Sequence, residues 1–68
     1  MIKKFLLDAL KKKYEAEIAE NTVTAKIYLT RSVGIGEHPQ HLQELDKLIE
    51  KIANSEEKIK ILKELDNG

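Results

Sequence analysis

The chain lacks the residues on which several protein classes depend. Its 68 residues include no cysteine, so disulfides and thiolate metal sites are excluded. Basic and acidic residues number 12 each, and this zero net charge argues against a nucleic-acid-binding protein, which usually carries a basic excess. No apolar run approaches the roughly 18 residues of a membrane span, and Asp8 interrupts the first apolar stretch. We therefore expect a cytoplasmic protein without a membrane span or signal peptide.

The residues that break helices are concentrated in one place. Two of the three glycines and the only proline lie within residues 34–39. Gly34 suits the left-handed position that closes a helix, and Gly36 follows it in the same loop. Pro39 suits the first position of a new helix, where its missing N–H would be unpaired anyway. The pattern predicts one helical-hairpin domain over residues 1–68, with helix one at about 2–32, a loop at 33–38 and helix two at about 39–65.

The first predicted helix carries apolar residues on two opposite sides of a helical wheel. A helix in a simple hairpin needs only one apolar stripe, so the second side predicts an oligomer interface. The side predicted to face helix two contains Leu6, Leu7, Leu10, Tyr14, Ile18, Ala25, Tyr28 and Leu29. The predicted oligomer interface contains Phe5, Ala9, Ala16, Ala19, Val23 and Ile27.

The second predicted helix has one coiled-coil-like stripe. Its members recur at spacings of three and four residues. They are Leu45, Leu48, Ile52, Ser55, Ile59 and Leu62. The two helices together predict an all-α antiparallel hairpin that dimerises into a four-helix bundle. Ile61 and Leu65 lie one turn apart on the far side and are the predicted contact with a further partner.

Two features of this pattern leave alternatives open. Residues 22–30 alternate polar and apolar and are rich in β-branched side chains, which also suits a strand. We favour a helix there, because no turn signal separates this stretch from the helical residues before it. Asn21 and Ser55 could share a buried polar layer that fixes the register of the hairpin. Solvent exposure of Asn21 and of Asn54, the neighbour of Ser55, is the alternative.

One cluster of side chains has a spacing that suits metal binding. His41 and Glu44 lie one helical turn apart, and Glu37 and His38 precede them in the loop. Helical bundles that bind two metal ions use several such motifs, whereas this chain offers one. We therefore expect no metal, no cofactor and no catalytic residue, and hence no enzyme.

The first helix begins with a cluster of lysines. Such an end can bind nucleic acid or an anionic membrane surface, or it can pair with carboxylates of helix two or of another subunit. We favour pairing with carboxylates, and keep a nucleic-acid accessory protein as the alternative function. The cluster consists of Lys3, Lys4, Lys11, Lys12 and Lys13, with Asp8 between them.

The loop and the start of helix two carry a resemblance. Residues 33–48 read VGIGEHPQHLQELDKL. This segment resembles one in small uncharacterised helical-hairpin proteins of tailed bacteriophages. The resemblance implies a phage origin and a location inside the host cell, and it implies no particular activity. The expected function is a non-enzymatic protein-interaction or assembly module that self-associates and contacts a host or viral protein.

Overall fold

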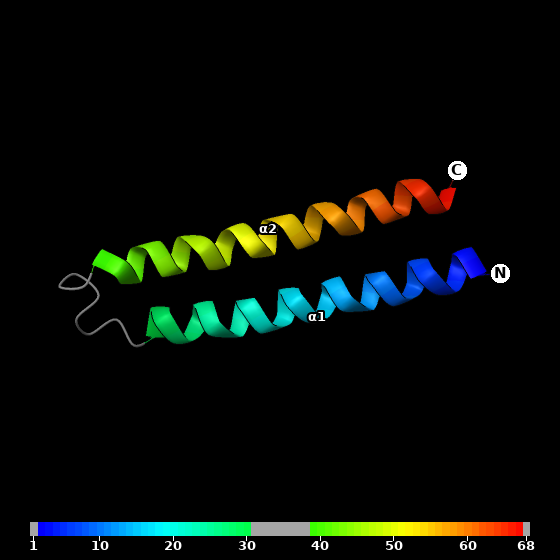
Figure 1. Cartoon of the computed structure of the whole chain (residues 1–68). Coiled ribbons are helices and arrows are strands. Elements are labelled where there is room, and N and C mark those ends of the chain that lie inside the picture. The colour runs from blue at the N-terminus through cyan, green and yellow to red at the C-terminus, as the bar shows by residue number, and fades with distance from the viewer. Residues whose placement is uncertain (1, 31–38, 68) are drawn as a thin grey trace.

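A computed structural model describes residues 2–30 and 39–67 of the chain as two long helices (Figure 1). Helix α1 is Ile2–Thr30 and helix α2 is Pro39–Asn67, each of 29 residues. The helices run antiparallel and pack against each other, so both chain ends lie at one end of a rod measuring 52 × 15 × 12 Å. The predicted all-α helical hairpin is confirmed. The predicted loop residues Gly34 and Gly36 lie outside the described residues.

Residues 22–30 belong to α1, so the alternative of a strand there is wrong. Their threonine hydroxyls find acceptors within the helix. Thr24 Oγ1 donates to the carbonyl oxygen of Glu20 at 3.1 Å, and Thr30 Oγ1 donates to that of Ile27 at 3.2 Å. Threonine tolerates a helix partly because its hydroxyl can bond to a carbonyl of the preceding turn. The strong helical preference of the neighbouring residues therefore outweighs the β-branched pattern.

Within the described residues the two helices match the predicted bounds except at the end of α2. α2 begins at Pro39, the residue predicted to open it, and continues to Asn67 rather than ending near residue 65. In this last turn Asp66 accepts a hydrogen bond of 3.3 Å from Lys4 of α1. Residues 31 and 32, which were predicted to end helix one, lie outside the described residues.

The seam between α1 and α2 is long and thin. Ala25 and Leu62 are its buried apolar residues and Ser55 is its buried polar one. No large side chain of residues 2–30 or 41–67 is fully buried. Half-buried residues complete the seam and occupy the predicted stripe of α2 almost throughout. They include Leu7, Tyr14, Ile18 and Tyr28 on α1, and Leu45, Leu48, Ile52 and Ile59 on α2.

Some residues predicted to face α2 do not reach it. Leu6 and Leu29 are each 60% exposed, and Leu10 is 37% exposed. These three lie at the edges of a broad apolar stripe, and one partner helix covers only the centre of such a stripe. The seam of α1 is therefore narrower than the sequence pattern predicted.

Candidate interaction surfaces

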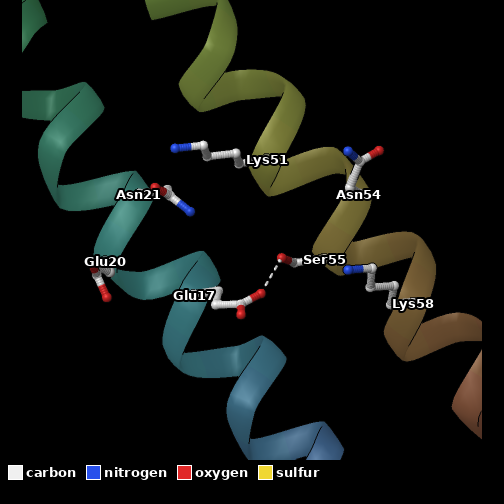
Figure 2. A pocket seen from close by; sticks show the side chains of 7 residues that line it. All are labelled: Glu17, Glu20, Asn21, Lys51, Asn54, Ser55 and Lys58. Atoms are coloured by element: carbon white, nitrogen blue, oxygen red, sulfur yellow. Dashed lines mark hydrogen bonds between the residues drawn. The ribbon is translucent and has the colours of Figure 1, made fainter.

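A polar layer interrupts the seam halfway along the rod. Ser55 is 3% exposed, and its Oγ donates a hydrogen bond of 3.2 Å to Glu17 Oε2 (Figure 2). Asn21 is half-buried on the neighbouring turn of α1, whereas Asn54 is exposed. The hydroxyl needs a partner because an unpaired buried polar group costs about 1–3 kcal/mol. Ser55 and Asn21 thus share the predicted layer, and Glu17 completes it.

Glu17 is the member of this layer that the sequence reasoning missed. A usable signal was present, because a serine within a stripe of leucine and isoleucine needs a hydrogen-bond partner, which a polar side chain of the facing helix can supply. The acidic residue one turn before Asn21 meets that requirement.

An open groove of about 370 Å³ lies beside the polar layer. Its two walls carry opposite charge, with Glu17 and Glu20 contributed by α1 and Lys51 and Lys58 by α2 (Figure 2). Lys58 also places its ammonium 5.2 Å from the centre of the Tyr14 ring, which is a cation–π contact. The groove is a charged flank of the hairpin, and the Ser55–Glu17 hydrogen bond forms part of its lining.

The outer face of α1, on the side away from α2, is apolar and open. Phe5 is 73% exposed, Val23 57% and Ile27 49%. The predicted interface residues Ala9, Ala16 and Ala19 are likewise exposed, and they bring small side chains to the middle of the same face. All six predicted interface residues are therefore accessible to a second chain.

The predicted partner contact on α2 is also accessible. Ile61 and Leu65 are both exposed, and they lie one turn apart near the end of the rod that carries the chain termini. Leu42 and Ile49 form further exposed apolar positions on the same helix. Ile61 and Leu65 are therefore accessible to a partner.

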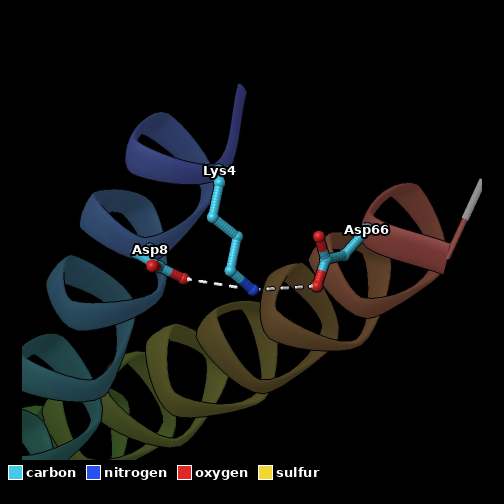
Figure 3. Close-up of polar contacts among 3 residues, drawn as sticks. All are labelled: Lys4, Asp8 and Asp66. Carbon is cyan, nitrogen blue, oxygen red and sulfur yellow. Dashed lines mark hydrogen bonds and ion pairs between the residues drawn. The ribbon is translucent and has the colours of Figure 1, made fainter. Parts of the chain in front are cut away.

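Two of the five N-terminal lysines, Lys4 and Lys11, lie near carboxylates. Lys4 Nζ sits 3.8 Å from Asp8 Oδ1 and 3.3 Å from Asp66 Oδ2, so it bridges the two helices (Figure 3). Lys11 lines the same small groove as these two carboxylates. Part of the positive charge of this end is therefore neutralised within the hairpin.

The histidine cluster falls partly outside the described residues. Glu37 and His38 lie outside the described residues. The Glu44 carboxylate forms an ion pair of 3.5 Å with Lys47 on the same helix. His41 is half-buried and meets the ring of Tyr28 edge-on, with ring centres 5.7 Å apart and planes at 73°. Within residues 2–30 and 39–67 no three histidine or acidic side chains group as metal ligands would. His41 thus serves the packing of the two helices near the loop.

Comparisons with protein-family models, with curated proteins and with solved structures find no match to this chain. The resemblance of residues 33–48 to phage proteins therefore stays a prediction. Neither α1 nor α2 is apolar enough along its length to cross a membrane.

Proposed function

We propose that this chain is a non-enzymatic assembly module that works as a self-associated dimer of hairpins, forming a four-helix bundle. The observation that supports the proposal is the large area the single hairpin exposes. The chain exposes 5562 Å², whereas a folded protein of its 7.8 kDa mass exposes about 4,400 Å². A single hairpin therefore leaves an excess of about 1,200 Å² accessible to solvent.

This excess is of the size that an interface removes. A standard protein–protein interface buries about 800 Å² on each partner. The apolar outer face of α1 is the natural place for it, because Phe5, Val23 and Ile27 are large and exposed together. Burying them would supply apolar contact that the thin seam, with Ala25 and Leu62, does not supply alone.

A second surface would remain for a different protein. Ile61 and Leu65 lie on α2, so pairing through the outer face of α1 leaves them accessible. We propose a host or viral protein as their partner, in line with the phage origin that residues 33–48 suggest. The module would then join copies of itself to a further protein.

The solution mass tests the proposal directly. Multi-angle light scattering at micromolar chain concentration is expected to give at least twice the chain mass of 7.8 kDa. The midpoint of thermal unfolding is expected to rise with protein concentration, because association stabilises the folded chain by mass action. A monodisperse monomer whose unfolding midpoint does not depend on concentration would overturn the proposal.

A nucleic-acid accessory role for the lysine cluster is the alternative, and the ion pairs of Lys4 argue against it. Binding to phosphates should weaken steeply with salt, because each neutralised phosphate releases counterions. We expect little binding to duplex or single-stranded DNA at about 150 mM salt in a gel-shift experiment. Submicromolar binding that is lost on changing Lys11, Lys12 and Lys13 to glutamine would favour the alternative instead.

A further inference from the structure

The outer face of α1 has the same pattern when read from either end. Ala16 lies at its centre, Ala9 and Val23 lie seven residues to either side, and Phe5 and Ile27 lie eleven residues to either side. At 100° per residue these five positions fall within about 20° of the direction of Ala16. They therefore form one narrow stripe with small side chains at the centre and large ones at the ends.

A stripe of this kind fits a second copy of itself related by a twofold axis. In such an interface residue i contacts residue j of the partner, and j contacts i. We propose, building on the self-association proposed above, that two chains pair α1 against α1 in the antiparallel direction with the axis at Ala16. Phe5 then lies against the partner's Ile27, and Ala9 lies against the partner's Val23.

Side-chain size supports this register. Each alanine near the centre meets an alanine or a valine, so the two backbones can approach to the lower end of the usual 8–10 Å between packed helices. Phe5 and Ile27 are 73% and 49% exposed in the single hairpin, and each gains the other as an apolar cover. Large side chains meet only at the two ends, where the helices have room to diverge.

Charge supports the antiparallel direction. Lys13 and Glu20 lie on the same edge of the stripe, about 20° apart on the wheel, and both are exposed. The proposed axis brings Lys13 beside the partner's Glu20, and symmetry makes this pair twice. Neither residue has an ion-pair partner within the described parts of α1 and α2. A parallel pairing would instead leave Lys13 and the partner's Glu20 on opposite edges of the interface and about 10 Å apart along the helix axis, so this pair would not form.

Introduced cysteines test this arrangement, because the chain has none of its own. A disulfide needs Cα atoms within about 7 Å. Ala16→Cys is expected to form a disulfide-linked dimer with oxidised glutathione. Ala9→Cys and Val23→Cys are each expected to stay unlinked alone, because in the antiparallel dimer each lies about 21 Å from its own copy. An equimolar mixture of these two variants is expected to link. Glu50→Cys on α2 is the control that should not link.

The outcomes separate this inference from the proposed function. Linking of Ala9→Cys and Val23→Cys each to itself would show a parallel dimer and overturn the inference, although self-association would stand. A dimer in which Ala16→Cys fails to link would place the interface elsewhere and also overturn it. A monomer of the unsubstituted protein by light scattering would overturn the proposed function itself.

Charge reversal supplies a second, independent measurement. Glu20→Lys is expected to raise the dimer dissociation constant about tenfold, because two attractive pairs become repulsive. Lys13→Glu is expected to raise the dissociation constant by a similar factor. The double variant K13E/E20K is expected to restore the original dissociation constant. The control is Glu57→Lys, an exposed position on α2 that should leave the constant unchanged. A double variant no tighter than the single ones would contradict the proposed register.

Discussion

The two sides of α1 differ in a way that the hairpin alone does not require. The inner side, against α2, buries Ala25 as its apolar residue and carries Glu17 in a hydrogen bond with Ser55. The outer side exposes Phe5 and Val23 to solvent. The inner side therefore supplies polar specificity, and the outer side holds apolar area that stabilises the chain only when something covers it.

This contrast indicates how stability is divided between folding and association. Hydrophobic stabilisation scales with apolar area removed from water, at about 25 cal/mol per Å². A seam without a fully buried large side chain contributes little of it. A buried serine–glutamate contact adds register rather than much free energy, as buried polar groups do in coiled coils. We expect folding of the hairpin to be coupled to its association.

Charging the centre of the outer face is expected to have the largest effect. Ala16→Glu would bring two carboxylates together at the proposed twofold axis and strip them of water. We expect the dissociation constant of the dimer to rise about 100-fold or more, because unpaired buried charges cost several kcal/mol. Analytical ultracentrifugation measures the constant. Ala53→Glu, the same change at an exposed position of α2, is the matched control. Equal effects of the two changes on the dissociation constant would show that the outer face of α1 is not the dimer interface.

A pair of neighbours on α2 compares the seam with the far side. Leu62 is buried against α1, whereas Ile61 beside it is exposed. Leu62→Ala is expected to lower the free energy of unfolding by about 2 kcal/mol, since it removes a packed side chain. Ile61→Ala is expected to change it by no more than about 0.5 kcal/mol. Urea unfolding at fixed protein concentration measures both. A larger loss at Ile61 would mean that the far side is covered in the dimer.

The fold was predictable from the sequence because two independent signals agreed. The stripe from Leu45 to Leu62 sets the face of α2, and Pro39 opens that helix. The breadth of the apolar stripe on α1 was the misleading part, since Leu6 and Leu29 belong to it by angle but lie beyond the reach of one partner helix. Periodicity gives the direction in which a side chain points, but it does not give the width of the apolar stripe that one neighbouring helix can cover.

The polar contacts were predictable only in outline. The sequence placed Asn21 and Ser55 at comparable levels of the two helices, yet it did not select Glu17 as the acceptor. That choice depends on the axial stagger of the helices, which residue spacing within each helix does not determine. The same limit applies to Asp66, which lies just beyond the predicted end of helix two and is found helical and bonded to Lys4.

The polar layer is expected to show a moderate effect. Ser55→Ala removes the donor to Glu17, and we expect a loss of about 1 kcal/mol in the free energy of unfolding, typical for one hydrogen bond. Glu17→Gln keeps an acceptor oxygen at the same place, so its loss should be smaller. Thermal unfolding of the two single variants and the double variant gives the coupling between them. Purely additive losses would show that the contact contributes nothing to stability.

The bridge between the two chain ends is expected to give the smallest effect. Lys4 and Asp66 form a charged hydrogen bond of 3.3 Å, but both side chains are about half exposed or more. Exposed pairs contribute about 0.2–1 kcal/mol and are screened by salt. A double-mutant cycle with Lys4→Gln and Asp66→Asn should therefore give a coupling near the lower end of that range. The coupling should fall toward zero at about 1 M salt, where the screening length is about 3 Å. If the coupling instead exceeded that of Ser55 with Glu17 and resisted salt, the bridge would be desolvated, which would mean that the partner hairpin covers it in the dimer.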